Sequence, residues 1–294
     1  YLLTFNKVSL NIIHNEIYSL INIKKPNPFV LVSTNHGMMI INKNDYRDYE
    51  YEGRNVRNGV GHQLLETSSY EQTEVDLVID LIAARRRHHG DGVIAIDCGA
   101  NIGILSIEWA RFMTGWGRVI SFEAQAKLFY AFAGNIVLNN CLNIDAFHSA
   151  IGDKVGKMAI PEPNYLVPSS YGALDLEERP NNMDIGQKID YKKTINVDLK
   201  TIDSLTLERV DFIKIDVEGM EESVLEGAKL TIRKLKPMLF IEVLKSNPDS
   251  IRKKLSSLDY EIFPMGMNLL AVHKKDPTIK DISTSENSIT INIE

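Results

Sequence analysis

The sequence has few cysteines, no long apolar run and no excess of basic residues. Its 294 residues include 2 cysteines, Cys98 and Cys141, which do not make a disulfide framework, and we expect them to stay unpaired. No apolar stretch approaches the ~20 residues needed to cross a bilayer. No secretory signal is visible either. The net charge of −6 argues against a general nucleic-acid-binding surface, and the composition is that of an ordinary soluble globular protein.

A glycine is also missing from the motif that follows the first strongly apolar run. Residues 97–103 read Asp-Cys-Gly-Ala-Asn-Ile-Gly, whereas a dinucleotide-binding turn spaces three glycines as G-x-G-x-x-G. An apolar run that ends in an acid and a glycine predicts a buried parallel strand with a ligand site beyond its carboxyl end. Asp97 would repel a pyrophosphate but attract a cationic group. S-adenosylmethionine (SAM) carries both an ammonium and a sulfonium group.

The next apolar run supplies a second acid for the same ligand. Residues 118–122 predict a strand that ends at Glu123, 20 residues after Gly103. An acid in that place accepts the hydroxyls of a ribose in nucleotide-binding folds. A ribose contact combined with a turn that tolerates a cation favours SAM over NAD.

Three further acids are candidates for chemistry. Asp216 and Glu218 follow the apolar run 211–215, and Glu242 ends the run 238–241. An alcohol acceptor needs a base to remove its proton. Asp216 is the preferred polar anchor or base; Glu218 is either catalytic or an acid that interacts with a helix N-terminus. Glu242 is a second base candidate, because a buried strand rarely keeps an unpaired acid.

These acids also raise the question of a metal. In principle they offer Mg²⁺ the oxygen ligands that it prefers. No Asp-Asn pair or Cys/His cluster in the sequence supports a dedicated site, so we predict no required metal.

The motifs resemble those of the FkbM-type SAM-dependent methyltransferases over roughly residues 68–273. The resemblance rests on the segments 97–103, 121–124, 213–221, 224–228 and 236–242, of which Lys-Ile-Asp-Val-Glu-Gly at 214–219 is the most specific. It implies a class I fold with a seven-stranded sheet and O-methylation of a sugar or secondary-metabolite hydroxyl. Ala124 departs from the pattern, because many relatives have proline after the acid.

The resemblance also implies a set of cofactor contacts. A Tyr70-Glu71 pair before the first strand resembles a contact on the cofactor side, and the end of the third strand resembles an adenine contact. The expected set is Glu71, Asp97, Gly99, Ala100, Asn101, Gly103, Glu123, Ala124, Ser149, Ala150 and Asp216. Because SAM is made and kept in the cytoplasm, we expect a cytoplasmic protein.

Alternation of strands and helices predicts a doubly wound, mostly parallel α/β sheet. We expect strands at 93–97, 118–122, 144–149, 156–160, 211–216 and 238–243, a closing antiparallel pair at 260–263 and 268–273, and helices at 71–87, 104–113, 125–139, 220–235 and 249–258. The closing pair separates this fold from NAD domains.

The chain divides into an extension at 1–67, a methyltransferase domain at 68–275 with an insertion at 161–197, and a polar tail at 276–294. In the extension we expect a helix over 8–23, a hairpin around residues 34–37 and a loop from 44 to 61. The tail offers an edge strand through Ile289, Ile291 and Ile293. The insertion reads equally as a substrate lid or a mobile surface loop. The extension either covers the site or mediates assembly, a homo-oligomer being one option.

The leading hypothesis is therefore a SAM-dependent O-methyltransferase acting on a small-molecule or glycan acceptor. An NAD(P)- or nucleotide-binding oxidoreductase is disfavoured by the missing glycine and by the closing strand pair. A SAM-binding module without catalysis is opposed by the intact acids. The sequence leaves open the acceptor, the choice between O- and N-methylation, and which acid is the base.

Overall fold

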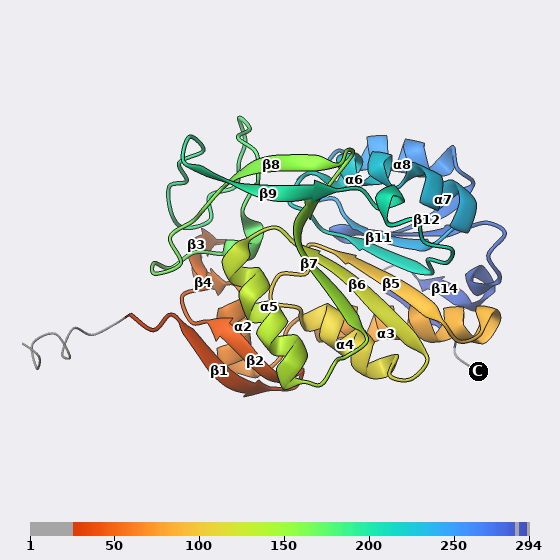
Figure 1. The fold of residues 1–294 in the computed structure, drawn as a ribbon, viewed down its shortest axis with the longest axis horizontal. Coiled ribbons are helices and arrows are strands. Elements are labelled where there is room, and N and C mark those ends of the chain that lie inside the picture. Colours follow the sequence, from red (N-terminus) through yellow and green to blue (C-terminus); the bar gives the residue numbers. More distant parts are fainter. Residues whose placement is uncertain (1–25, 286–287, 293–294) are drawn as a thin grey trace, which may run out of the picture.

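A nine-stranded sheet forms the centre of the protein (Figure 1). The computed structural model describes residues 26–285 and 288–292, so the helix expected over 8–23 lies outside the described part. The strands lie in the order β12-β13-β11-β10-β5-β6-β7-β9-β8. Their bounds are β5 Val93–Cys98, β6 Gly117–Glu123, β7 Ile144–Ile151, β8 Gly156–Pro161, β9 Thr194–Lys200, β10 Phe212–Ile215, β11 Met238–Glu242, β12 Tyr260–Met265 and β13 Asn268–His273.

Helices cover both faces of this sheet and bury both sets of its side chains. The helices are α3 Gln72–His89, α4 Ile104–Phe112, α5 Ala126–Leu138, α6 Glu221–Gly227, α7 Lys229–Leu235 and α8 Pro248–Ser256. Along β5, Val93 and Ala95 join the core shared with α3 and α4, whereas Ile94 and Ile96 join the core shared with α6 to α8. Because side chains alternate along a strand, an unbroken apolar run is what a sheet covered on both faces requires.

The predicted α/β class and the closing antiparallel pair β12–β13 are confirmed. The sheet has nine strands where seven were expected. The two strands that flank the insertion raise the number: β8, which falls on the strand expected at 156–160, pairs antiparallel to β9, and β9, where no strand was expected, pairs parallel to β7. The insertion therefore leaves and re-enters the fold at the edge of the sheet.

Residues 44–61 are not the loop that we expected. They contain the hairpin strands β3 (Arg47–Tyr51) and β4 (Arg54–Asn58), and the helix α2 (Val60–Thr67) begins in the same stretch. The turn at Glu52-Gly53 has positive φ at both residues, as a tight hairpin requires. Both strands are largely polar, so the hydrophobic alternation that normally reveals a strand is weak here.

The helix expected over 220–235 is two helices, α6 and α7, separated at Ala228. A Cβ atom at Gly227 would lie 1.9 Å from the carbonyl oxygen of Gly152, so only glycine allows this close contact. The tail departs from expectation as well. Its strands β14 (Ile282–Ser285) and β15 (Ser288–Ile291) pair with each other after a short 3₁₀ helix, η3 (Pro277–Asp281), and do not extend the main sheet.

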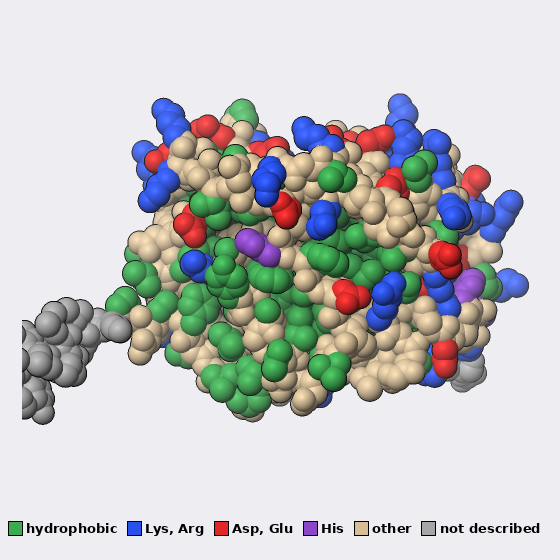
Figure 2. Space-filling view, in the orientation of Figure 1, with side chains coloured by type: hydrophobic (Ala, Val, Ile, Leu, Met, Phe, Trp, Pro, Cys, Tyr) green, Lys and Arg blue, Asp and Glu red, His purple; other side chains and the backbone are tan. Residues whose placement is uncertain are grey.

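The extension adds a hairpin against α5. Strand β1 (Phe29–Thr34) pairs with β2 (Gly37–Asn42), and Met39 and Ile41 are fully buried in the core. Figure 2 shows apolar side chains gathered over the face that carries α5 and this hairpin, while charged side chains lie mainly along the upper and right rims. The homo-oligomer stays a prediction.

Two expectations from composition concern cysteines and membranes. Cys98 and Cys141 are both buried and unpaired, as expected. Among the described residues, none of the helices has the length and apolarity that crossing a bilayer requires.

Candidate active site

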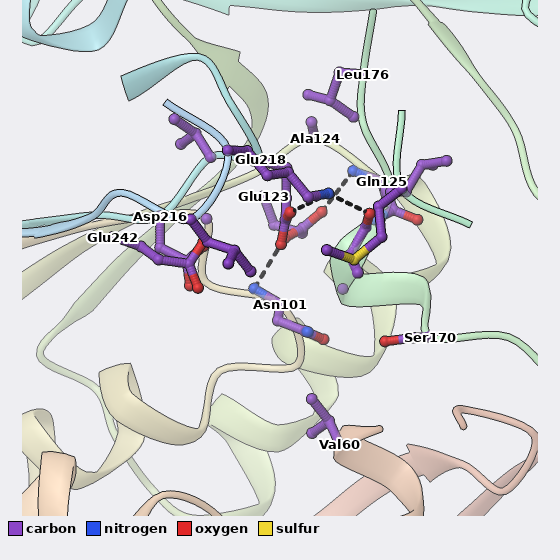
Figure 3. A pocket seen from close by; sticks show the side chains of 18 of the residues that line it. Val60, Asn101, Glu123, Ala124, Gln125, Ser170, Leu176, Asp216, Glu218 and Glu242 are labelled. Carbon is purple, nitrogen blue, oxygen red and sulfur yellow. Dashed lines mark hydrogen bonds and ion pairs between the residues drawn. The ribbon is translucent and has the colours of Figure 1, made fainter. Parts of the chain in front are cut away.

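A cavity of about 440 Å³ lies beyond the carboxyl ends of the parallel strands, beside a smaller one of about 140 Å³. This is where ligands bind in open parallel sheets, and the larger volume suits a nucleoside-sized ligand. Figure 3 shows the acids Glu123, Asp216, Glu218 and Glu242 gathered around it, with Val60 of the extension on one side and Leu176 of the insertion on the other.

The Glu123 carboxylate holds the turn after β5 and the first residues after β6 through hydrogen bonds from their backbone. The two carboxylate oxygens of Glu123 accept the N–H of Asn101 at 2.8 Å and the N–H of Gln125 at 2.7 Å (Figure 3). Gly99 has φ +87°, and a Cβ there would lie 1.8 Å from the Asp216 carbonyl oxygen. Burial raises the pKa of Glu123 to about 7 in spite of these hydrogen bonds.

Strand register brings a buried lysine between two acids. Lys214 lies opposite Asp97 in the pairing of β10 with β5. Its Nζ is 3.7 Å from Asp97 Oδ1 and 3.0 Å from Asp216 Oδ2. Asp97 Oδ2 accepts a hydrogen bond from the Ser106 hydroxyl at 2.5 Å, whereas Asp97 Oδ1 is buried without a hydrogen-bond partner. Burial alone would lower the pKa of Lys214, but the surrounding carboxylates raise it above its ordinary value.

The turn after β10 places Glu218 beside these groups. Glu218 has φ +56°, a conformation that non-glycine residues rarely adopt. The buried Glu221 carboxylate fixes the turn by accepting the N–H of Val217 at 3.1 Å and the N–H of Gly219 at 2.9 Å. Lys245 Nζ then lies 2.6 Å from Glu218 Oε2.

Three carboxylates converge at this point. Ligand atoms of Asp216, Glu218 and Glu242 lie within 4.8 Å of one another. In the pairing of β10 with β11, Lys214 lies opposite Phe240. Continuing this register by two residues places Asp216 opposite Glu242. The structure therefore brings together the three acids that the sequence nominated for catalysis.

The site carries more negative than positive charge. Lys214 pairs with Asp216 and Lys245 pairs with Glu218, but no cationic partner of Glu242 occurs in the described part of the chain. Burial, followed by the charges of Asp216 and Glu218, raises the pKa of Glu242 to about 8. The pKa of Glu218 is likewise raised to about 8, by burial and then by Asp216. A cationic ligand would relieve this repulsion.

The insertion and the extension are tied to the cofactor side of the cavity. Gln125 donates through Nε2 to the Tyr171 carbonyl at 2.8 Å and accepts from the Tyr165 hydroxyl at 3.0 Å. In the extension, buried Asp45 accepts the N–H of Tyr171 at 3.1 Å and the N–H of Gly61 at 3.3 Å. The lid function of the insertion stays a prediction.

Most of the expected cofactor contacts line the two cavities. They are Glu71, Asp97, Gly99, Ala100, Asn101, Glu123, Ala124, Ser149, Ala150 and Asp216. Gly103 is the exception, because it faces the Phe132 ring of α5 and lines neither cavity. Their roles as contacts remain predictions.

Sequence reasoning did not nominate the two lysines. The signal for Lys214 was present, since a lysine inside the buried run Phe212–Ile215 needs a partner. Lys245 gave no comparable signal, because it lies in the irregular segment after β11.

The residues on the walls fit SAM. The excess of carboxylates suits a ligand with two positive groups, and Asp97 Oδ1, which has no hydrogen-bond partner, is an acceptor available to an ammonium. Each Glu123 oxygen keeps a lone pair for a ribose hydroxyl after accepting one backbone N–H.

Comparison with known proteins decides the family. The model of the FkbM methyltransferase domain matches residues 97–262, more than half of the chain. This chain belongs to the FkbM methyltransferase family. The match confirms the resemblance to FkbM-type methyltransferases and SAM as the cofactor, whereas the domain bounds 68–275 stay a prediction.

Two curated fungal relatives are similar at lower coverage. Methyltransferase 1 of Beauveria bassiana is 26% identical over 147 residues, which span 47% of this chain and 59% of that protein. Methyltransferase sdnD of Sordaria araneosa is 24% identical over 184 residues, which span 55% of this chain and 70% of that protein. The chain thus matches less than two thirds of the length of the Beauveria protein.

Among solved structures, methyltransferase FkbM from Methylobacillus flagellatus is similar at 21% identity with a TM-score of 0.44. The likeness covers 62% of this chain and 44% of that one.

Proposed function

We propose that this protein is a SAM-dependent O-methyltransferase that methylates a hydroxyl group of a sugar, glycan or secondary metabolite. The observation that supports the proposal most is the convergence of Asp216, Glu218 and Glu242 beside the turn that follows β5. When bound, SAM supplies a methyl group activated by a sulfonium. The residues of the chain have to hold the acceptor in line with that methyl group and receive the acceptor's proton.

Glu242 is the base in this proposal. Asp216 and Glu218 each have a lysine ammonium within 3.0 Å, which stabilises their ionised form and weakens them as bases. The pKa of Glu218 and that of Glu242 are both raised to about 8, so the missing ammonium partner of Glu242 among the described residues is what sets it apart. It accepts the hydroxyl proton while the acceptor oxygen forms its new bond to carbon. This ranking reverses the order expected from sequence, in which Asp216 came first.

The other two acids then have supporting roles. Asp216 and Glu218, held by Lys214 and Lys245, orient polar groups of the acceptor or the cofactor. Leu174, Leu176 and Met183 of the insertion line the same cavity. The acceptor therefore has an apolar side as well as a hydroxyl.

Binding of the cofactor is the first test. We expect calorimetric titration of the wild type to give micromolar binding of SAM and no comparable binding of NAD⁺. Glu123→Ala should weaken SAM binding at least about tenfold, because the ribose acceptor is lost. Glu261→Gln, which removes an exposed acid on β12, is the matched control. Thermal unfolding of each variant separates lost binding from lost folding.

Turnover is the second test. A panel of sugars, phenols and amines, assayed with methyl-labelled SAM and analysed by mass spectrometry, distinguishes O- from N-methylation. Methyl transfer to hydroxyls supports the proposal. SAM binding without transfer to any acceptor favours the module without catalysis, and absence of SAM binding overturns the assignment of the site.

A further inference from the structure

His36 is a buried histidine that lies outside the matched domain, and each of its ring nitrogens has a hydrogen-bond partner. It occupies the turn between β1 and β2, and its side chain is fully buried. Its Nε2 accepts the N–H of Tyr70 at 2.9 Å, and its Nδ1 lies 3.0 Å from Glu108 Oε1 on α4. One side chain thus joins the extension, the segment before α3 and the helix after the glycine-containing turn.

These two contacts fix the state of the ring. Because the Tyr70 N–H is a donor, Nε2 has to carry a lone pair. Nδ1 then carries the proton and donates it to the Glu108 carboxylate. His36 is therefore neutral in the Nδ1–H tautomer and acts as an acceptor toward Tyr70. Arg111, 3.5 Å from Glu108, balances the charge of that carboxylate.

The amide that His36 holds belongs to a wall of both cavities. Tyr70 and Glu71 line the larger and the smaller cavity alike. Glu71 has φ +46°, so the backbone is constrained at the residue that follows the held amide. A second bond supports the same segment, since the Asn35 N–H donates to the Ser68 carbonyl at 2.8 Å.

The hairpin that carries His36 is itself firmly attached. Asn139, the residue after the last turn of α5, accepts the Met38 N–H at 3.0 Å and donates to the Met38 carbonyl at 2.8 Å. Asn135 of α5 accepts the Ile40 N–H at 2.5 Å and donates to the Ile102 carbonyl at 2.9 Å in the turn after β5. The hairpin therefore supports the cavity from two sides.

We propose that His36 is a positioning residue for SAM: its Nε2 holds the Tyr70–Glu71 wall, so that the extension is a working part of the cofactor site. The inference rests on the proposed function, because it assigns a task in binding the cofactor. His36 does not touch the reacting atoms. Loss of the His36 side chain should therefore weaken SAM binding and have little effect on kcat at saturating SAM.

Two variants distinguish the hydrogen bond of Nε2 from that of Nδ1. In His36→Gln the amide oxygen reaches the place of Nε2, so the acceptor for the Tyr70 N–H is kept. In His36→Asn the shorter amide reaches only the place of Nδ1, so that acceptor is lost while the contact with Glu108 is kept. Glu108→Gln is the control for charge, because its amide oxygen still accepts from Nδ1–H.

The measurements are calorimetric SAM binding, steady-state kinetics and hydrogen exchange of the Tyr70 amide. We expect His36→Asn to raise the Kd and KM for SAM about tenfold, with kcat at saturation changed less than about twofold, and to speed exchange at Tyr70. His36→Gln and Glu108→Gln should stay within about threefold of the wild type. In the wild type, nitrogen chemical shifts of His36 should report a protonated Nδ1.

The opposite outcomes are equally clear. Equal loss of SAM affinity in His36→Asn and His36→Gln, or unchanged affinity in both, overturns the role of Nε2. A fall in kcat and melting temperature with an unchanged KM for SAM points to a purely structural histidine and also overturns it. If the wild type binds no SAM, the proposed function fails first, and fast Tyr70 exchange in the wild type would still overturn the contact on its own.

Discussion

Strand β10 has an aspartate at each end, and the two have opposite surroundings. Asp211, just before the strand, is buried and accepts from Arg85 Nε at 3.1 Å, from Arg209 Nε at 2.8 Å and from the Ile94 N–H at 2.9 Å. Asp216, just after the strand, has one lysine and two neighbouring carboxylates, and its side chain is 31% exposed. The charge of Asp211 is thus neutralised within the fold, whereas the charge around Asp216 is left for a cationic ligand to neutralise.

The cluster at Asp211 is built for stability. Arg85 also pairs with Asp276, which precedes η3, so it ties the segment after β13 to the amino end of the sheet. Every charge in this group faces an opposite one. At the other end of the strand, carboxylates outnumber ammonium groups, and burial together with the charge of Asp216 raises the pKa values of Glu218 and Glu242.

Removing Asp211 should have the largest effect on stability. Asp211→Ala leaves Arg85 partly uncompensated in a buried position, and we expect a loss of about 3–5 kcal/mol. Denaturant unfolding followed by circular dichroism measures this. A loss below about 1 kcal/mol would show that solvent or Asp276 compensates Arg85 and would remove the contrast between the two ends.

Removing Glu242 should have the largest effect on activity. Glu242→Gln keeps the shape of the side chain but removes the base, so we expect kcat to fall about 10²- to 10⁴-fold. The free energy of unfolding should stay the same or rise slightly, because one source of repulsion disappears. Steady-state methyl transfer and denaturant unfolding test both parts, with Glu261→Gln as the control. A normal kcat in Glu242→Gln would return the role of base to Asp216 or Glu218.

Stability and activity should also respond to pH in opposite directions. Burial and the nearby acids raise the folded-state pKa of Glu242 from 4.5 to about 8. Between these values the folded protein keeps a proton that the unfolded chain has released, so stability falls as pH rises from about 4.5 to about 8. Activity needs the ionised carboxylate, so kcat/KM rises over the upper part of this window and levels off above pH 8.

Glu242→Gln is the variant that checks this pH dependence. It should make the fall of stability with rising pH shallower, while Glu218 and Glu123, whose pKa values are also raised, keep part of that fall. It should also remove the rise of kcat/KM with pH. Because a bound cation lowers the pKa of a nearby acid, the limb in kcat should lie at lower pH than the limb in kcat/KM. Coincident limbs in the wild type would argue against a cationic ligand beside Glu242.

Removing the side-chain cap of α8 should give the smallest effect. The Asn247 side chain caps α8 by accepting the N–H groups of Asp249 and Ser250. Asn247→Ala should cost about 1 kcal/mol of stability and leave kcat unchanged. Denaturant unfolding and steady-state kinetics give both values. A large loss of activity in this variant would mean that the site depends on general stability, and it would weaken every assignment made from the contrast between Asp211 and Asp216.

The sequence predicted the elements that have a strong pattern. Strands such as β5 and β10 are unbroken apolar runs, and the acids after them mark the edge of the sheet where ligands bind. The hairpin β3–β4 was missed because its strands are polar on both faces. The break between α6 and α7 was missed because the apolar pattern runs through it, and the close contact of Gly227 with Gly152 beside it joins two residues far apart in the chain.

The same limit applies within the site. The candidate acids could be named from local motifs, but their relative basicity could not, because it depends on register and on which lysine approaches which carboxylate. Lys214 meets Asp97 only through the pairing of β10 with β5. His36 gave no local signal, since its partners Tyr70 and Glu108 come from two other elements.

The attachment of β2 to α5 has a consequence for where the protein can be cut. The family match begins at residue 97, yet Met39 and Ile41 are fully buried in a core shared with α3 and α4. The side-chain amide of Asn135 also forms hydrogen bonds both with β2 and with the turn after β5. A fragment trimmed to residues 97–262 would expose that apolar surface to water and leave the Asn135 oxygen without its donor. The smallest piece that folds by itself should therefore be longer than the piece that homology recognises.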